Sequence, residues 1–149
     1  MKKNFFEWIV YFLLFIWQIL QNLIGIGFWL YFKLRGDLET IVTNKYSKVY
    51  RSKYMWGGIS LGSFAFVSNN LAKKETSIRH EQGHFFQSKL LGIFYLPTVG
   101  ISSLIHAWLY DPKKSCYYNF WCEAWANKHA GVGVDKNCHL YIKEKGALD

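Results

Sequence analysis

The stretch that decides the fold prediction is His80-Glu81-Gln82-Gly83-His84. It lies within residues 76–91, where polar residues at the start and Gly92 directly after the end predict a helix. On a helix, residues four apart share one face, about one turn apart. The spacing therefore predicts two imidazoles side by side.

Two imidazoles at this spacing can bind one Zn²⁺ ion through nitrogen. Glu81 follows the first of them and is expected beside the metal, where its carboxylate can accept a proton from a bound water. A zinc-bound water has a pKa near neutrality, so hydroxide is available to attack a carbonyl. The pattern predicts His80 and His84 as zinc ligands and Glu81 as the general base.

The string Glu123-Ala124-Trp125-Ala126-Asn127 offers a third ligand. Glu123 would supply a carboxylate oxygen from a second helix, which we expect over residues 118–130. Asn127 lies one turn later on the same face. It is predicted to hydrogen-bond the far nitrogen of a ligand histidine and so fix its tautomer.

HEQGH followed by EAWAN resembles the gluzincin pattern, in which a helix with H-E-x-x-H precedes a helix with E-x-x-A-D or a close variant. More closely, HEQGHFFQS, LG-x-x-YL, G-x-x-SLI and E-x-WAN are similar to strings in a group of small uncharacterised bacterial and phage HExxH proteins. The resemblance covers residues 57–131 and implies a minimal zincin fold, with two site helices and a strand lining the cleft. Asn127 stands where many gluzincins have Asp. Ile93 and Ser102 stand where relatives often have Pro, which leaves the shape of the crossing segment open.

The remaining pattern is that of an α+β protein. Residues 48–67 are β-branched and aromatic and are broken by glycines, which predicts two short strands around a turn. Residues 59–67 are either an edge strand that pairs with an extended peptide or an ordinary sheet strand. Residues 93–109 are apolar but contain Pro97 and Gly100, so they are either a buried segment or a piece lying at a membrane interface.

Residues 8–32 form a run of 25 residues without a formal charge, with aromatic side chains at both ends. A bilayer core requires about 20 apolar residues in a helix, and aromatic residues favour its two interfaces. The run predicts a single-pass transmembrane helix, or a long hydrophobic helix, over residues 1–35. A zincin-like metallopeptidase domain is then expected over residues 36–149.

Three polar residues interrupt this run, and their spacing places Gln18, Gln21 and Asn22 on one helical face. In lipid such a face is predicted to contact a partner helix. The basic residues that follow the run favour contact with membrane lipid and a cytoplasmic C-terminal domain.

The formal net charge of +8 does not by itself indicate nucleic acid. The basic residues accompany no zinc finger, phosphate loop or RNA-binding motif, so we expect no nucleic-acid partner. The three cysteines, Cys116, Cys122 and Cys138, are too few and too irregular for a disulfide framework. They are expected to be free thiols in a reducing compartment.

Several other residues have two interpretations. Tyr117 and Tyr118 are either oxyanion-stabilising groups or, more simply, core aromatics. Gln87 either lines the cleft or, as we expect, is a solvated helix residue. Trp121 and Trp125 are expected to pack. Three further histidines are alternative ligands, although an isolated histidine is more often structural: His106, His129 and His139.

The expected function is zinc-dependent hydrolysis of peptide bonds in a peptide or protein substrate by a membrane-anchored metallopeptidase. The alternative is a catalytically inactive zinc-binding protein, either structural, as part of a larger assembly or virion, or active in membrane interaction. A fourth protein ligand from Cys122 or His129 would favour a structural site, because catalytic zinc sites keep one position open.

Overall fold

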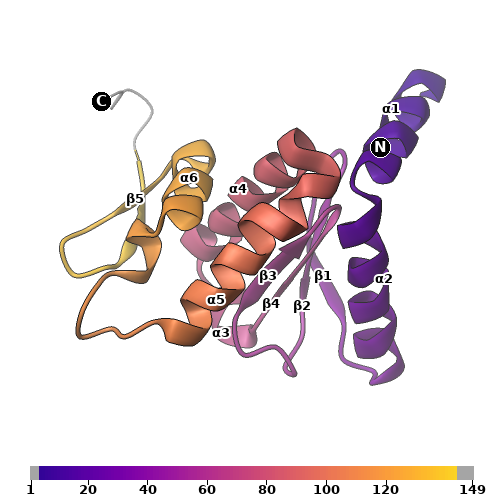
Figure 1. The fold of residues 1–149 in the computed structure, drawn as a ribbon. Coiled ribbons are helices and arrows are strands. Elements are labelled where there is room, and N and C mark those ends of the chain that lie inside the picture. The colour runs from indigo at the N-terminus through magenta and orange to yellow at the C-terminus, as the bar shows by residue number, and fades with distance from the viewer. Residues whose placement is uncertain (1–3, 144–149) are drawn as a thin grey trace.

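The computed structural model describes residues 4–143 of the chain. The architecture is α+β, with helices on both faces of a four-stranded sheet and a small hairpin at one end (Figure 1). The helices are α1 Phe5–Trp17, α2 Ile19–Leu34, α3 Asn69–Ala72, α4 Glu75–Leu91, α5 Ile101–Leu109 and α6 Trp121–Ala130. The strands are β1 Glu39–Thr43, β2 Lys48–Arg51, β3 Gly58–Leu61, β4 Phe64–Val67, β5 Val132–Val134 and β6 Leu140–Ile142. Short 3-10 and π turns lie at Gly92–Phe94, Leu96–Gly100 and Tyr117–Asn119.

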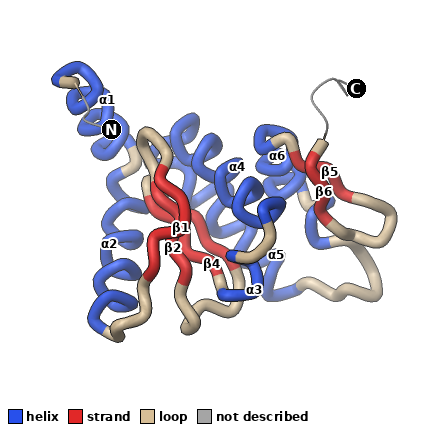
Figure 2. The backbone as a smooth tube through the Cα atoms, turned by 180° about the vertical axis from the view of Figure 1, so that it is seen from behind, coloured by secondary structure: helices blue, strands red, loops and turns tan. Residues whose placement is uncertain are grey.

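The large sheet has the order β1-β2-β4-β3, with β2 and β4 parallel and the other neighbours antiparallel (Figure 2). Because successive side chains of a strand point to opposite faces, the sheet supports two separate clusters. Val49 and Val67 pack with Phe85 of α4 on one face. Tyr50 and Phe66 pack with aromatic residues of α2 on the other face. The strand β3 lies at one edge of the sheet.

The expectation of one long N-terminal helix is wrong. The apolar run is divided into α1 and α2, which meet at a bend of 95°. Within residues 4–143, no single helix is both long and apolar enough to cross a membrane; two bent helix pairs, α1 with α2 and α4 with α5, meet the length and composition criteria together. The prediction of a single-pass transmembrane helix is therefore wrong. We call the bent pair of α1 and α2 the N-terminal elbow.

The polar stripe of the run explains the bend. Gln18 Nε2 donates to the Leu14 carbonyl, which also accepts the Gln18 backbone N–H, and Asn22 Nδ2 donates to the Phe15 carbonyl, so side-chain amides bond carbonyls of the last turn of α1 at the break. Gln21 Nε2 donates across to Ser88 Oγ of α4. Gln18 also bonds Ser88 of α4, whereas Asn22 accepts the Ser63 backbone N–H next to β4, so all three polar residues are buried against other parts of this chain.

The helix α2 belongs to the packed fold. Phe32 is buried, and its ring lies 5.6 Å from that of Phe66 on β4. Gly25 lies so close to the sheet that a Cβ there would meet the Phe64 ring at 2.8 Å. These contacts make α2 part of the same core as the sheet.

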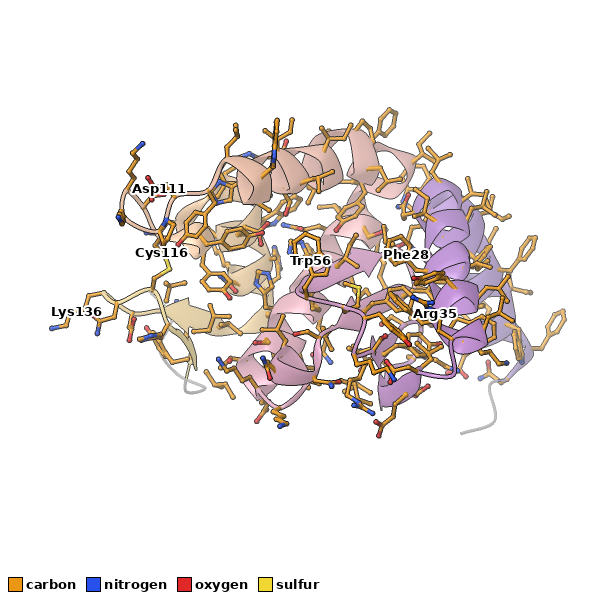
Figure 3. The ribbon with its side chains drawn as sticks, turned by 90° about the horizontal axis from the view of Figure 1, so that it is seen from below. Phe28, Arg35, Trp56, Asp111, Cys116 and Lys136 are labelled. Carbon is orange, nitrogen blue, oxygen red and sulfur yellow. A yellow bond between two sulfur atoms is a disulfide. The ribbon has the colours of Figure 1, made fainter. Side chains whose placement is uncertain are left out.

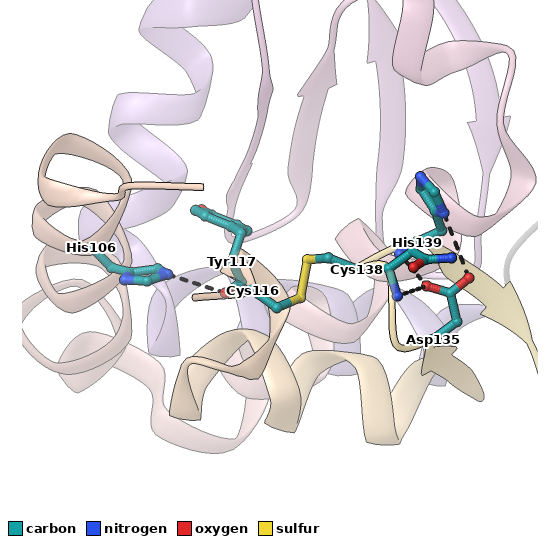
Figure 4. Close-up of a disulfide and its surroundings, with 7 residues drawn as sticks. His106, Cys116, Tyr117, Asp135, Cys138 and His139 are labelled. Carbon is teal, nitrogen blue, oxygen red and sulfur yellow. Dashed lines mark hydrogen bonds and ion pairs between the residues drawn. A yellow bond between two sulfur atoms is a disulfide. The ribbon is translucent and has the colours of Figure 1, made fainter. Parts of the chain in front are cut away.

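A disulfide links Cys116 to Cys138, with a Cα–Cα distance of 5.4 Å (Figure 4). It ties the segment before Tyr117 to the turn between β5 and β6, where Asp135 accepts hydrogen bonds from the backbone of that turn. The expectation of free thiols is wrong for this pair and holds for Cys122, which is free and buried. The argument for a reducing compartment loses its basis, because such disulfides persist in oxidising environments.

Candidate metal centre

Two helices that pack closely together build the site. The contact is closest at Gly83 of α4, where a Cβ would lie 2.1 Å from the Ala126 carbonyl oxygen of α6. Only glycine allows this approach, which explains physically why the second variable position of HEQGH carries no side chain. The result is that His80 and His84 directly face Glu123.

The three side chains converge on one point. Glu123 Oε2 lies 3.1 Å from His80 Nε2 and 3.3 Å from His84 Nε2, and the two Nε2 atoms are 3.2 Å apart. Ligand atoms at about 2.0–2.1 Å from a tetrahedral ion are separated by about 3.3–3.4 Å. All three residues are buried, and they lie close enough to bind one metal ion.

The tautomer of His84 is fixed by Gln87. Gln87 Nε2 donates to the Cys122 carbonyl at 2.7 Å, which turns its Oε1 towards His84 Nδ1 at 2.8 Å. A carbonyl oxygen only accepts, so Nδ1 carries the proton and, in the neutral ring, Nε2 presents a lone pair to the centre. Gln87 is fully buried and positions a ligand, contrary to the expectation of a solvated side chain.

Asn127 occupies the equivalent position for the other histidine. Its Oδ1 lies 2.8 Å from His80 Nδ1. Asn127 was predicted to bond the far nitrogen of one of the two histidines, and its Oδ1 lies at that nitrogen of His80. Its Nδ2 is buried and has no partner among residues 4–143, so this amide is held less firmly than that of Gln87.

Glu123 is held from its other side by the crossing segment. Ser103 Oγ of α5 donates to Glu123 Oε1 at 2.5 Å, which leaves Oε2 for the histidines. Burial alone would raise the pKa of Glu123, but its hydrogen bonds with His80 and His84 lower it well below the usual range. Burial would lower the pKa of His84, but the hydrogen bond and charge of Glu123 raise it. The centre therefore attracts positive charge.

Glu81 projects from α4 towards the sheet. Its Oε2 accepts a 2.6 Å hydrogen bond from Ser60 Oγ of β3. Its Oε1 lies where a Cβ of Gly58 would be, at 2.1 Å. Within residues 4–143 no Lys or Arg forms an ion pair with this carboxylate. Glu81 thus lies between the site helix and the edge strand, beside but not within the three-residue cluster.

The edge strand presents backbone groups next to Glu81. Ser68 N–H donates to the Gly57 carbonyl, so alternation along the antiparallel ladder turns the backbone of Gly58 and Ser60 away from β4. Tyr95 Oη donates to the Ser60 carbonyl and braces this side of β3. Gly58 is exposed, so its N–H and C=O are accessible to an extended chain.

The two aromatic candidates contact different histidines. The Tyr118 ring packs against His80 with centroids 5.4 Å apart. Burial and the nearby carboxylates of Glu81 and Glu123 raise the pKa of Tyr118, so its hydroxyl stays protonated and able to donate. The Tyr117 ring instead packs against His106, whose Nε2 lies 3.1 Å from the Tyr117 carbonyl (Figure 4).

The alternative ligands lie elsewhere. His106 stacks on Phe120, His129 stacks on Phe86, and His139 pairs with Asp135. Burial raises the pKa of the Cys122 thiol to about 12, with the charge of Glu123 adding to the shift, so it is a poor thiolate ligand. Among the described His, Cys, Asp and Glu residues, only His80, His84 and Glu123 form such a cluster.

Sequence reasoning missed Gln87, Ser103 and Ser60 as functional residues. Gln87 lies three residues after His84, on a neighbouring helical face, which was an available signal. No signal in the sequence indicated Ser103 and Ser60, because they reach the site from other helices and strands. No protein-family model, curated protein or solved structure matches this chain.

Proposed function

We propose that this protein is a zinc-dependent peptidase. The observation that carries the proposal is a buried cluster of two histidines and one carboxylate, with no fourth His, Cys, Asp or Glu in it among residues 4–143. Catalytic zinc sites have three protein ligands and an open position, whereas structural sites have four. The set of two histidines and one glutamate is of the catalytic kind, in keeping with the gluzincin resemblance.

Zinc suits this centre because nitrogen and carboxylate oxygen at tetrahedral spacing are its usual ligands. Bound there, it would lower the pKa of a water and polarise a carbonyl. His80, His84 and Glu123 would hold the ion. Gln87 and Asn127 would keep both Nδ1 atoms protonated, so that both Nε2 lone pairs stay directed at the metal.

Glu81 is the candidate general base and acid. Its carboxylate has one hydrogen bond from Ser60 Oγ and lies next to exposed backbone, so it can take a proton from an attacking water and deliver it to the leaving amine. Tyr118, whose ring packs against His80, supplies a protonated hydroxyl suited to donating to a developing oxyanion.

A peptide is the substrate class that β3 favours. An extended chain can add to an exposed sheet edge through main-chain hydrogen bonds, and this edge runs past Glu81. The position of a Cβ at Gly57 has no atom within 4 Å, which leaves room for such a chain, whereas the corresponding space at Gly58 is filled by the Glu81 carboxylate. The inactive structural or assembly role remains the alternative, and it predicts zinc without turnover.

The test is hydrolysis of an unstructured protein by the full-length chain, with zinc content measured on the same sample. We expect about one zinc per chain and cleavage that a chelator abolishes and added zinc restores. Stoichiometric zinc without cleavage of a broad peptide library would favour the structural alternative. Absence of bound zinc would contradict the metal assignment itself.

A further inference from the structure

The helix α5 has the reverse of the polarity expected for a water-facing helix. Ser103 and His106 turn inward, where they bond to Glu123 and to the Tyr117 carbonyl. The outward side chains are apolar and exposed, with Trp108 at 84% and Leu104 at 70%. A helix at a water-facing surface normally buries its apolar face and exposes its polar one.

The N-terminal elbow repeats this reversal. Gln18, Gln21 and Asn22 are at most 1% exposed, whereas α1 has no buried residue. The exposed apolar side chains of α1 and α2 are Phe5, Phe6, Trp8, Ile9, Phe12, Leu13, Ile16, Trp17, Leu20, Leu23, Ile24, Ile26, Leu30, Tyr31 and Leu34.

The two reversed regions meet at the end of α4. Trp17 Nε1 donates to the Lys89 carbonyl, and the Trp17 ring lies over Gly92. Ile93 and Phe94, which follow, are themselves exposed and lead towards α5. We call the exposed apolar side chains of α1, α2, residues 90–94 and α5 the outer apolar surface. Figure 3 shows side chains projecting outward all along these helices.

The charges around this surface indicate what covers it. The α5 sequence has no Lys, Arg, Asp or Glu, and neither do residues 8–32. At the end of α2, Lys33 lies over the Trp29 ring at 4.4 Å and Arg35 over the Tyr31 ring at 5.4 Å. Paired aromatic and cationic side chains are typical of the boundary between hydrocarbon and lipid headgroups. The net charge of +8 complements anionic lipid.

We propose that the outer apolar surface is embedded in one leaflet of an anionic lipid bilayer. The two bent elements enter the leaflet side by side without crossing it. The 13 residues of α1 extend about 20 Å, less than the roughly 30 Å of a bilayer core. Polar side chains turned inward and apolar ones turned outward are what hydrocarbon surroundings require. Since Ser103 of α5 bonds Glu123, the metal centre lies about one helix diameter from the lipid.

The test is flotation of the full-length, zinc-loaded chain with vesicles of phosphatidylcholine, with and without phosphatidylglycerol. We expect the protein to float with both and more tightly with the anionic vesicles. The double variants Phe12→Glu with Leu13→Glu, and Leu104→Glu with Trp108→Glu, should each weaken binding by about tenfold or more, because charge replaces buried apolar area. The matched control is Tyr141→Glu, which should bind as the parent does. Tyr141 is 48% exposed on β6, the strand at the opposite end of the molecule from α1 (Figure 2).

Two results would overturn the proposal. One is a detergent-free, monomeric chain that does not float with either vesicle. The other is a stable oligomer that excludes vesicles, which would assign the surface to a second copy of the chain. Zinc content and circular dichroism of each variant separate loss of binding from loss of folding. The proposal does not depend on catalysis, so it can succeed or fail independently of the peptidase assay.

Discussion

The two sides of α4 differ in how firmly they hold their functional groups. Towards α6, each histidine has an amide partner, and the Glu123 carboxylate is held by Ser103 at one oxygen. Towards β3, Glu81 has a single side-chain partner, Ser60, beside the exposed backbone of Gly58. Glu81 is as buried as the two histidines, so the two sides differ in the number of bonds that fix each group and not in burial. Metal binding and turnover should therefore be separable by mutation.

The largest effect is expected on the α6 side. The change His84→Ala should remove zinc and reduce hydrolysis to background, because only two ligands remain. Metal analysis of the purified variant measures this directly. The control is His129→Ala, whose exposed ring stacks on Phe86 away from the centre and whose loss should leave zinc in place. Full zinc retention by His84→Ala would refute the ligand assignment.

Mutation on the β3 side of α4 should have a different effect. Glu81→Gln keeps the size of the side chain and can still bond Ser60, but it removes the base. We expect zinc content to stay at the parent level while kcat falls by about 10²–10⁴-fold. Activity that survives this change would exclude Glu81 as the base, and loss of zinc would show that the two sides of α4 are not independent.

Removing the amide of Gln87 and removing that of Asn127 should lower zinc affinity by different amounts. Gln87→Ala and Asn127→Ala should each lower zinc affinity by about 10–100-fold, with the larger effect at Gln87, because both ends of that amide are bonded. Competition with a fluorescent zinc chelator gives the affinities. Gln87→Glu keeps an acceptor for His84 Nδ1 and should recover most of the loss, which a purely structural role would not produce.

The pH dependence should reverse between the metal-free and zinc-loaded protein. Without metal, the raised pKa of His84 stabilises the fold fully below its ordinary value of 6.5, and this contribution is lost as the pH rises through the folded value. The lowered pKa of Glu123 adds stability that is present above its ordinary value of 4.5. The metal-free Tm should therefore be highest between pH 4.5 and 6.5 and fall as the pH rises from 6.5 through the folded pKa of His84. Zinc competes with the same protons, so its stabilisation should grow with pH, as thermal scans with chelator or zinc would show.

The smallest effect on the metal is expected from the disulfide, which lies outside both helices. Reducing Cys116–Cys138 should lower the free energy of unfolding by about 3 kcal/mol on loop-closure grounds, for a sequence separation of 22. Zinc should remain bound, because none of its ligands moves with the bridge. Denaturant unfolding with and without reductant measures the loss, and a Cys116→Ser/Cys138→Ser variant should show no response to reductant.

Local spacing was enough to predict the cluster. The four-residue interval between His80 and His84 requires only a helix, and helix α4 was expected within one residue of its observed bounds. The second helix begins three residues later than expected, after a 3-10 turn. The string EAWAN was enough to predict Glu123 as a member of the cluster. Its orientation, however, depends on Gly83 of α4 and Ser103 of α5, which contact α6 from other helices.

Features that depend on distant partners were not predictable in this way. The break at Gln18 arises because polar side chains bury against α4, some 70 residues away along the chain. Residues 48–67 form three strands where two were expected, since a parallel pair between β2 and β4 leaves no local signature. No strand was predicted for the hairpin of β5 and β6, and the pairing of Cys116 with Cys138 does not follow from their spacing.

The bridge between Cys116 and Cys138 also bears on the order of events during biogenesis. Tyr117 and Tyr118 follow directly after the first cysteine, so the wall of the site next to His80 is tethered only once the bridge has formed. A newly made chain in reducing surroundings would hold its metal ligands on α4 and α6 but lack this tether. The bridge forms where the surroundings are oxidising, so the tether beside His80 depends on the redox conditions that the chain meets.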